Sequence, residues 1–569
     1  MRTKRVNWLF LLAASGAFAG ALGASGGCSD DNANPGPGPG PGPGTDGSVP
    51  DQYTPPDATP PRDAGSACSL PEDTDPSPKV RLVNVLLATN QGLPIGQLDA
   101  PAIRLYANGA VIPNLDPAAP GKGAPSVTKY AKITAGDVTF SAKDDGASDA
   151  SAAVDIRTHP VAVAPGARLT IFAIGRAGSS EGSPSLVIAE EKFDRPRCGE
   201  VKLRFLNADY GATIDSFAIG SGDDSSAALK LGESSNEKGV TAPAAAKSIL
   251  LTTADPGVVG PTKRAPFTVP ASVLGGGGRS YFVVSVGEPA RWADDERTHA
   301  LLLVPAGDDT PATLVKRDPL AYIFHASPPP TPGLLEVQSG KDIAANLKYG
   351  AKSTYLDVAP GGATLKFVDP AGTPVDGGAD GGDAGTSGAG AAVLDNQSTG
   401  PLEPGGIYVG AIMGFSGSTG AEQLRSKFWK VRATPGFISS TAPRSIVIHA
   451  SPNAPAVDVG YWNTKSDGKR GDDFTPKFTN IAYGETSDLA GTVFAIPQNG
   501  TLLQRWVGVQ PTGDQASNRA NVATGNPLDV NVAILMGDWN DKDPKRNAQL
   551  AFIPLSASGT IRRFQLPKP

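Results

Sequence analysis

The stretch RSIVIHASPNAPAVDVGY, Arg444–Tyr461, is the clearest copy of a pattern that recurs along this chain of 569 residues. A short run of β-branched residues at Ile446–Ile448 predicts a buried strand, and the Ser-Pro-Asn step after it predicts a tight turn. Val457 and Val459 then alternate with other residues, as in a second strand that is buried on one face. The stretch therefore predicts two strands joined by a turn.

Three weaker copies of the pattern lie upstream at nearly even spacing. The copies align on one residue at the end of the opening strand, here called the strand-end position, with separations of 123, 118 and 124 residues. The strand-end position is occupied by Asn84, Asn207, His325 and His449. A later apolar strand ends in glycine in every copy, at Gly175, Gly287, Gly414 and Gly537. Repeats of this length are whole domains, because solenoid units are only about 20–50 residues long.

The composition agrees with short strands joined by many turns. Glycine and proline contribute 69 and 53 residues, hydrophobic residues make up 39% of the chain, and no segment keeps a helical apolar pattern over three turns. We therefore expect an all-β protein of four tandem β-sandwich modules of the immunoglobulin-like kind. The expected modules are repeat 1 at 76–198, repeat 2 at 199–317, repeat 3 at 318–440 and repeat 4 at 441–569. Because the connections are only a few residues long, we expect neighbouring modules to stack end to end.

Residues 1–28 have the order of an export signal. Three basic residues within the first five are followed by an apolar segment up to about Leu22, and small residues then precede Cys28. This arrangement resembles a bacterial lipoprotein signal, in which the cysteine thiol is lipidated and becomes the mature N-terminus, although Ser25 stands where such signals usually have leucine. An ordinary cleaved leader and an uncleaved membrane helix are the alternatives.

Residues 29–75 contain the run PGPGPGPGPG at Pro35–Gly44 and almost no apolar side chains. Such a segment cannot bury enough surface to offset its ordering entropy, so we expect a disordered tether. With Cys28 lipidated, Cys68 and Cys198 remain as an even pair in an oxidising compartment. We therefore predict a disulfide between them that ties the base of repeat 1. Two free thiols are the alternative.

Repeats 3 and 4 carry the most specific motifs. HASPNAPAVDVGYW at His449–Trp462 is followed by a Tyr-Gly step in FTNIAYGETS at Phe478–Ser487, and repeat 3 keeps HASP and LKYGAKSTYLDVAPGG at Leu347–Gly362. Repeat 1 keeps DAPAIRLYANG and Tyr130, whereas repeat 2 has neither the proline nor a clear Tyr-Gly step. These motifs resemble a bacterial extracellular family of unknown function, with a consensus close to HASPDAPAVDVYVDG and a later Y-G-x-x-S segment. The resemblance implies a β-sandwich fold, often in tandem copies in secreted or anchored proteins, and no chemistry.

The strand-end position is the first candidate for chemistry. His325 and His449 share it with two asparagines, and a general base cannot be replaced by asparagine and keep its task. Both side-chain types are planar and can hydrogen-bond nearby backbone, so we expect a structural role, with a site role as the alternative. The other repeat-signature residues expected to be structural are Tyr349, Tyr483 and Asp458. We predict no catalytic residue, no metal site and no cofactor.

Two further groups of residues could carry a site. The Asp-rich patches at Asp144–Asp149 and Asp538–Asp543 do not match the calcium-loop pattern, so solvated loops are expected. Aromatic residues could form the floor of a sugar-binding face, although positions in a core or at a sandwich edge are the commoner use. The aromatic residues in question are Tyr349, Tyr355, Trp429, Trp462 and Trp539.

Charge and repetition narrow the function. The net charge of −6 gives no electrostatic footprint for nucleic acid. Repetition without a repeated catalytic set, together with an anchor and a tether, favours a non-enzymatic lipoprotein held by its lipid in the bacterial envelope, at the outer membrane or cell surface. We expect a structural or adhesive component that binds glycan or an envelope protein weakly and multivalently. The alternative is an envelope polysaccharide hydrolase that uses acidic residues of one diverged repeat.

Overall fold

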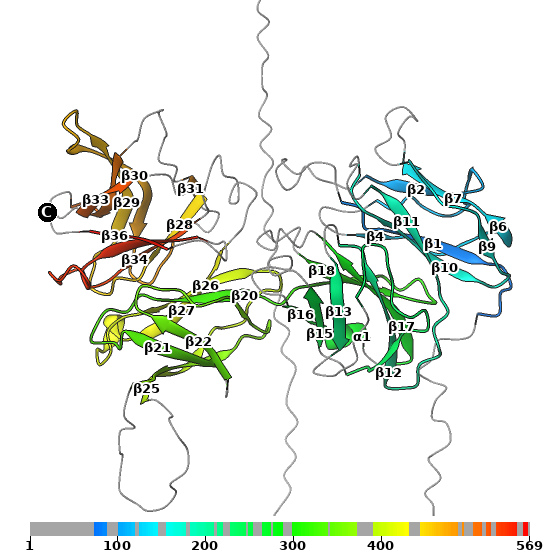
Figure 1. Cartoon of the computed structure of the whole chain (residues 1–569), viewed down its shortest axis with the longest axis horizontal. Coiled ribbons are helices and arrows are strands. Elements are labelled where there is room, and N and C mark those ends of the chain that lie inside the picture. Colours follow the sequence, from blue (N-terminus) through cyan, green and yellow to red (C-terminus); the bar gives the residue numbers. More distant parts are fainter. Residues whose placement is uncertain are drawn as a thin grey trace, which may run out of the picture. The chain divides into compact units, whose positions relative to one another are not determined.

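Strands make up nearly all of the regular structure of this protein (Figure 1). The structure, a computed structural model, describes residues 73–566 with internal gaps. The gaps are 88–100, 120–124, 146–154, 178–182, 210–212, 220–227, 246–247, 254–263, 275–276, 288–298, 340–341, 372–390, 432–443, 488–491, 494–503, 515–518, 525–530 and 555–560. Within the described residues the helical elements are the short α1 (Ala271–Leu274) and one 3-10 turn (Gly420–Glu422). The all-β prediction is therefore confirmed.

The first half of the chain holds the strands of repeats 1 and 2. In repeat 1 these are β1 (Lys79–Asn84), β2 (Ile103–Ala107), β3 (Ala110–Val111), β4 (Ser126–Val127), β5 (Ala131–Lys132), β6 (Gly136–Val138), β7 (Phe140–Asp144), β8 (Asp155–Arg157), β9 (Val161–Val163), β10 (Arg168–Ile174) and β11 (Ser185–Glu190). In repeat 2 they are β12 (Glu200–Asn207), β13 (Ile214–Ile219), β14 (Val240–Pro243), β15 (Ser248–Thr253), β16 (Arg264–Thr268), β17 (Arg279–Val286), β18 (Ala300–Pro305) and β19 (Thr313–Lys316).

The second half holds the strands of repeats 3 and 4. In repeat 3 these are β20 (Leu320–His325), β21 (Leu334–Ser339), β22 (Asp342–Lys348), β23 (Leu356–Asp357), β24 (Thr364–Asp369), β25 (Ala391–Ser398), β26 (Ile407–Met413) and β27 (Arg425–Val431). In repeat 4 they are β28 (Arg444–His449), β29 (Val457–Thr464), β30 (Arg470–Ile481), β31 (Thr492–Val493), β32 (Gln504–Pro511), β33 (Arg519–Thr524), β34 (Asn531–Met536), β35 (Gln549–Pro554) and β36 (Arg562–Gln565).

The opening strand of each repeat lies inside a mixed sheet, here called its opening-strand sheet. β1 pairs in parallel with β10, β12 with β17, β20 with β26 and β28 with β34. Each of these partners is the strand that runs into a glycine landmark, and it pairs antiparallel with the strand that follows it, which is β11, β18, β27 or β35. The same local strand order therefore recurs four times in sequences that differ at most positions.

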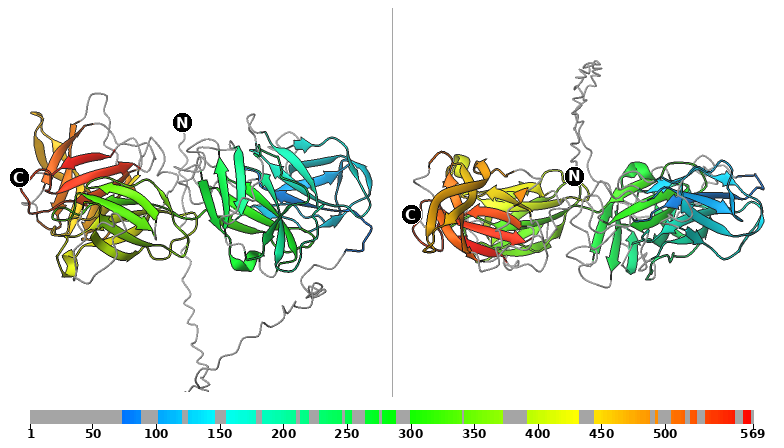
Figure 2. Two further views of the ribbon diagram at one scale, coloured as in Figure 1. Left: turned by 60° about the horizontal axis from the view of Figure 1, so that its bottom comes forward. Right: turned by 90° about the horizontal axis from the view of Figure 1, so that it is seen from above.

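Each repeat also has an antiparallel sheet, which contains the strand that follows the opening strand. The strand orders are β3-β2-β7-β8, β13-β15-β16, β22-β21-β24-β25 and β30-β29-β32-β33. In repeat 1, Val80 and Leu82 of the opening strand pack with Ile103 and Leu105 of β2 and with Phe140 of β7. A core of this kind forms because alternate side chains of a strand point to the same face. Figure 2 shows the strands from two further sides, coloured from blue for the first strands of the chain to red for the last.

The opening-strand sheets are also buried on their other face. In repeats 1 and 2, Val83 and Phe172 belong to one apolar cluster with Leu206 and Phe282. The rings of Phe172 and Phe282 meet edge to face with centroids 5.3 Å apart. We call this interface the 1–2 junction. In the same way, Phe324 of repeat 3 clusters with residues of β28 and β34 in repeat 4, and this interface is the 3–4 junction.

The expected end-to-end stacking is therefore wrong for these two pairs of repeats, which dock sheet against sheet. The physical reason lies in the opening strands, whose apolar runs are nearly continuous. A strand of that kind has apolar residues on both faces and is stable only in a sheet that is covered on both sides. The sequence interpretation considered each repeat as a sandwich of its own and judged the contact between repeats only from the length of their connections.

The end of the expected tether is ordered. Asp73 contacts Lys79 at 2.6 Å and also pairs with Arg168, while Asp75 contacts Lys132 at 2.9 Å. These contacts, that of Lys79 first, lower the pKa of Asp73 below its ordinary value. Asp73 and Asp75 thus contact repeat 1, although both lie in the segment that was expected to be a tether.

Three predictions on the N-terminal part lie outside the described residues. The signal at 1–28 with its lipidation residue Cys28, the tether before residue 73 and Cys68 all belong to this part of the chain. Cys198 is disulfide-bonded, but its partner is not among the described residues, so the pairing with Cys68 stays a prediction. Among the helices that the structure does describe, none is long and apolar enough to span a bilayer.

Candidate functional site

The strand-end position of repeats 1 and 2 is fully buried and bound to backbone. The Asn84 amide donates to the carbonyl oxygens of Pro101 at 2.9 Å and Ala118 at 3.0 Å, and its oxygen accepts the N–H of Leu86. Asn207 donates in the same way to the carbonyl of Leu229 at 2.9 Å. Each asparagine thus fastens the end of its opening strand to the loop that crosses it.

In repeats 3 and 4 a histidine does the same task. Nε2 of His325 lies 2.9 Å from the carbonyl oxygen of Pro332, and Nε2 of His449 lies 2.9 Å from that of Pro455. Because a carbonyl oxygen can only accept, Nε2 must carry the proton. Burial lowers the pKa of both imidazoles to about 4. Both rings are therefore neutral at neutral pH and hidden from solvent.

This burial predicts that repeats 3 and 4 lose stability in mild acid. An unfolded histidine takes up its proton near pH 6.5, whereas these two do so only near pH 4 in the folded chain. Between those values the unfolded chain binds more protons, so stability falls as the pH is lowered through this window. We expect each histidine to lower the free energy of unfolding by roughly 2–3 kcal/mol between pH 7 and 4.5.

The measurement is the urea midpoint at both pH values for the wild type and for His325→Asn/His449→Asn. Asparagine occupies the same position in repeats 1 and 2, so the double variant should fold and lose most of the pH dependence. His159→Asn, at an exposed residue of repeat 1, is the control and should leave that dependence unchanged. An unaltered pH dependence in the double variant would contradict the prediction.

The Tyr-Gly step binds the backbone carbonyl of the strand-end residue. The N–H of Gly350 donates to the carbonyl of His325 at 2.8 Å, and the N–H of Gly484 donates to that of His449 at 2.7 Å. The ring of the preceding Tyr349 stands edge-on to His325, with centroids 5.7 Å apart. The HASP motif and the Tyr-Gly motif are therefore two halves of one contact.

The structure also finds this step in repeat 2, where sequence reasoning missed it. The N–H of Gly232 donates to the carbonyl of Asn207 at 2.8 Å, so Leu231-Gly232 takes the place of Tyr-Gly. The step was not recognised in the sequence because leucine stands where repeats 3 and 4 have tyrosine. In repeat 1, by contrast, Tyr130 follows Thr128 by two residues and is the counterpart of Tyr355, which follows Ser353 by two residues. Tyr130 is therefore not part of a Tyr-Gly step.

A hydroxyl residue closes this contact in all four repeats. The partner of this residue is the opening-strand residue two positions before the strand-end position. The hydroxyl oxygen accepts the N–H of that partner at 2.9 Å in each repeat. The N–H of the hydroxyl residue in turn donates to the carbonyl of the same partner. The hydroxyl residues are Thr128, Ser235, Ser353 and Ser487. In repeats 3 and 4 they are the serines of the Y-G-x-x-S motif.

We predict that Ser487→Ala destabilises repeat 4 by about 1–3 kcal/mol, because the buried N–H of Val447 then loses its acceptor. Ser487→Thr is the matched control, since threonine fills the same place in repeat 1, and it should be close to neutral. Urea unfolding of the three proteins checks the prediction. Equal midpoints for the alanine and threonine variants would count against it.

The two motif tyrosines also contribute to the 3–4 junction. Tyr349 and Tyr483 both pack against its apolar cluster. The guanidinium of Arg425 in repeat 3 lies 5.1 Å from the ring centroid of Tyr483 in repeat 4. Burial raises the pKa of Tyr483 to about 12 and that of Tyr349 further above its ordinary value, so both phenols stay protonated. The motif therefore joins a turn within one repeat to the face of the next.

Asp458 holds an irregular part of the second sheet in repeat 4. One carboxylate oxygen accepts the N–H of Asn480 at 2.7 Å and the hydroxyl of Thr512 at 2.9 Å. Asn480 has a positive φ of 52° and lies where the pairing of β29 with β30 shifts register. Asp458 thus contacts β30 on one side of β29 and the residue just after β32 on the other side.

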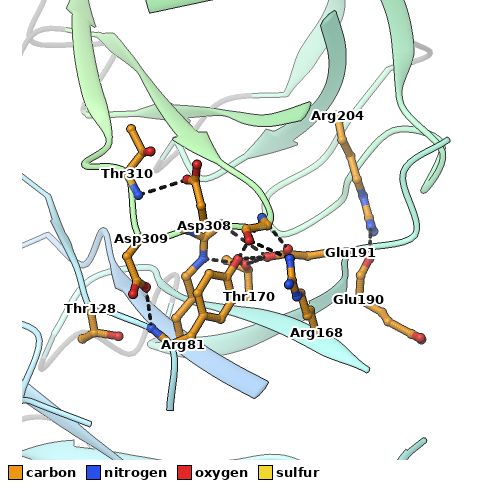
Figure 3. A network of polar contacts seen from close by, with 12 residues as sticks. Arg81, Thr128, Arg168, Thr170, Glu190, Glu191, Arg204, Asp308, Asp309 and Thr310 are labelled. Atoms are coloured by element: carbon orange, nitrogen blue, oxygen red, sulfur yellow. Dashed lines mark hydrogen bonds and ion pairs between the residues drawn. The ribbon is translucent and has the colours of Figure 1, made fainter. Parts of the chain in front are cut away.

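A polar network lies at the 1–2 junction, and sequence reasoning did not find it (Figure 3). The carboxylate of Glu191 accepts hydrogen bonds from the guanidinium of Arg81, the phenol of Tyr130, the hydroxyl of Thr170 and the N–H of Gly307 in repeat 2. The guanidinium of Arg81 also lies over the Tyr130 ring, 4.5 Å from its centroid. Burial and the neighbouring carboxylate raise the pKa of Tyr130 well above its ordinary value, so its phenol remains a donor.

A buried histidine–aspartate pair in repeat 2 was also not predicted. Nδ1 of His299 lies 3.1 Å from a carboxylate oxygen of Asp209, and both side chains are buried. Asp209 follows the strand-end position by two residues, where repeats 3 and 4 have the HASP serines. Those serines, Ser327 and Ser451, donate at 2.6 Å to the carbonyls of the landmark glycines instead. The pair is enclosed in the fold and presents no open face to a substrate.

The remaining candidates of the sequence interpretation also become ordinary parts of the fold. Among the aromatic residues proposed for a sugar-binding face, Tyr355, Trp429, Trp462 and Trp539 are buried and Tyr349 is partly buried. In the Asp-rich patch of repeat 4, Asp541 and Asp543 both pair with Arg546. Across the described ranges no group of three or more potential metal-ligating side chains gathers.

Comparison with known proteins places one segment of the chain in a family. A family model described as "Domain of unknown function (DUF4397)" matches residues 96–214, from just before β2 to the first residue of β13. No curated protein matches the chain. The matched segment covers the strands of repeat 1 from β2 to β11 and the opening strand of repeat 2, and it leaves out β1. Residues 96–214 therefore form a DUF4397 domain, which is the extent of the family relationship that the match shows.

Proposed function

We propose that this protein is a non-enzymatic lipoprotein of the bacterial cell envelope, anchored through Cys28, which presents four copies of the DUF4397 domain as ligand-binding or structural modules. Each copy would be a β-sandwich of the immunoglobulin-like kind. The recurring strand order and the fourfold hydroxyl contact support four copies. The ligand would be an envelope glycan or protein, bound weakly at each module and more strongly by several modules together.

The observation that carries the proposal is the use of the residues that recur. Asn84, Asn207, His325 and His449 are buried and bind backbone carbonyls, and the hydroxyl residues bind backbone amides. The residues that the repeats share therefore stabilise the fold. A chain that repeats a scaffold and varies its surface is suited to display or adhesion.

The anchor is tested by feeding cells that make the full chain a clickable fatty acid. Labelling of the wild type and its loss in Cys28→Ala would support lipidation, and Cys68→Ala is the control that should keep the label. A soluble wild-type protein without label would overturn this part of the proposal.

The binding role is tested with the full chain on envelope glycans and envelope proteins, beside a screen for hydrolysis of the same polysaccharides. Capture without turnover supports the proposal. Turnover that disappears with one Asp or Glu substitution would instead establish the hydrolase.

A further inference from the structure

The 1–2 and 3–4 junctions are built from different chemistry at equivalent positions. We call junction row the residue three before the strand-end position together with its parallel partner in the opening-strand sheet. The junction rows are Arg81 with Thr170 in repeat 1, Arg204 with Phe282 in repeat 2, Tyr322 with Val409 in repeat 3 and Ile446 with Val532 in repeat 4. One junction thus has an arginine in each row, and the other has none.

The arginines of the 1–2 junction are both linked to the opposite repeat, Arg81 through its partner Glu191 and Arg204 directly. Arg81 and Glu191 are only 1% and 4% exposed, and the N–H of Gly307 in repeat 2 completes their network at 3.0 Å. Arg204 of repeat 2 reaches in the other direction and donates to the carbonyl of Glu190 in repeat 1, at 3.0 Å (Figure 3). Burial lowers the pKa of Arg204, which reflects the cost of placing its charge in this junction.

The loop of repeat 2 that contains Gly307 and Asp309 adds further hydrogen bonds to repeat 1. Arg168 of repeat 1 donates to the carbonyl of Gly307 at 2.6 Å, and the N–H of Tyr130 donates to the carboxylate of Asp309 at 2.9 Å. These hydrogen bonds form only when repeat 1 faces repeat 2. Several polar groups of the 1–2 junction therefore find their partners only across the two repeats.

The 3–4 junction has apolar and aromatic residues at the same places. Tyr322 stands edge to face with Tyr355, and both belong to one cluster with Ile446 and Val532. Val431 of β27 pairs with Ile407, and Glu191, the residue after β11, bonds the equivalent Arg168 through its N–H, so Val431 and Glu191 have the same position. If Arg204 docked on this face, it would meet Val431 where repeat 1 presents the carboxylate of Glu191.

Connectivity alone does not select these pairs. β11 ends at Glu190 and β12 begins at Glu200, whereas β19 ends at Lys316 and β20 already begins at Leu320. The link between repeats 2 and 3 is thus shorter than the link between repeats 1 and 2. Nearness along the chain would favour docking of repeat 2 on repeat 3 at least as much as on repeat 1.

We propose that the junction rows, together with Glu191 and Val431, form a pairing code that directs repeat 1 to repeat 2 and repeat 3 to repeat 4. A wrong pair buries Arg204 away from the carboxylate of Glu191, and it buries the Arg81–Glu191 pair without the N–H of Gly307 and the carbonyl of Asp308. Buried charges and polar groups that lose their partners are strongly unfavourable. Rejection of wrong partners through buried charges is a common source of specificity. The code does not depend on which ligand the protein binds.

The first test erases the code in the full chain. The triple variant Arg81→Tyr/Glu191→Val/Arg204→Ile gives repeats 1 and 2 the residues of repeats 3 and 4. Wild type and variant are unfolded in guanidinium with the disulfide intact, refolded and cross-linked through lysine, and the linked peptides and the mass of the species are determined. Glu403→Val, the same change at a side chain that is 70% exposed, is the control.

We expect the wild type and the control to refold as monomers with cross-links within the pairs 1–2 and 3–4. The triple variant should give at least about tenfold more cross-links between wrong repeats, or oligomers, since a tenfold change needs only a small loss of discrimination. A triple variant with the cross-links and mass of the wild type would overturn the proposal.

The second test writes the code into the other junction and decides the matter if the triple variant does not refold. Tyr322→Arg should abolish the 3–4 cross-links, because the arginine would lie among apolar residues and near the ammonium of Lys352, which is 5.2 Å from the Tyr322 ring centroid. Adding Val431→Glu supplies the missing carboxylate and should restore most of those cross-links. A double variant no better than Tyr322→Arg alone, or a Tyr322→Arg protein that pairs normally, would overturn the code.

Discussion

Replacing Arg81 by methionine is expected to lower the free energy of unfolding of repeats 1 and 2 by about 3–5 kcal/mol. The change removes one partner of a buried ion pair and leaves the carboxylate of Glu191 in the 1–2 junction without its counter-charge. The phenol of Tyr130 and the hydroxyl of Thr170 still donate to it, but neither carries a positive charge. Urea unfolding followed by amide exchange of β1, β10 and β17 measures the loss where it occurs.

Two controls separate the ion pair from its surroundings. Arg81→Met/Glu191→Met removes both charges and should be much closer to the wild type, because a buried ion pair replaced by apolar residues of similar size is often neutral. Arg157→Met, at a side chain that is 70% exposed, should change stability by less than about 0.5 kcal/mol. A double variant as unstable as Arg81→Met would show that packing, rather than charge, dominates.

The second large effect is expected for Gly537→Ala, which should destabilise repeat 4 by about 3 kcal/mol or more. Gly537 has a φ of +89°, and a β-carbon placed there would collide with the carbonyl oxygen of Asn547 on the neighbouring segment. Its own carbonyl accepts the hydroxyl of Ser451, so a shift of this residue also strains the HASP turn. Thermal and urea unfolding of the full chain measure the change.

Gly468→Ala is the matched control, because Gly468 has a φ of +80° with open space around it. It should show the cost of the left-handed backbone alone, about 1–2 kcal/mol. The difference between the two variants then reports the collision. Equal losses for Gly537→Ala and Gly468→Ala would mean that the segment near Asn547 moves aside freely.

Local pattern predicted the parts of this fold that are made within one repeat. The opening strands, the second strands and the strand-end position follow from β-branched runs and alternation, because each strand shows its own period in the chain. The landmark glycines were recognisable because Gly175, Gly287, Gly414 and Gly537 punctuate strands at matching places, and all four have positive φ. The Leu231-Gly232 step was missed because its contact is made by the backbone N–H of Gly232, so the preceding residue can be leucine as well as the tyrosine of the motif.

The contacts between repeats could not be read in the same way. Arg81 looks like an exposed charge on a strand, and only the docking of repeat 2 makes it a buried residue with partners about 110 positions away at Glu191 and 227 positions away at Asp308. The five aromatic residues considered for sugar binding are likewise decided by burial, which depends on the neighbouring sheets.

Strand periodicity and turn chemistry were therefore enough to establish an all-β chain with a recurring unit, since those signals act over a few residues. The partner of each outer face, the ion pair at the 1–2 junction and the burial of the histidines emerged only from the packed chain. An apolar or charged side chain has the same local pattern whether its face meets water or another sheet, and the free energy that distinguishes the two cases comes from segments distant in sequence.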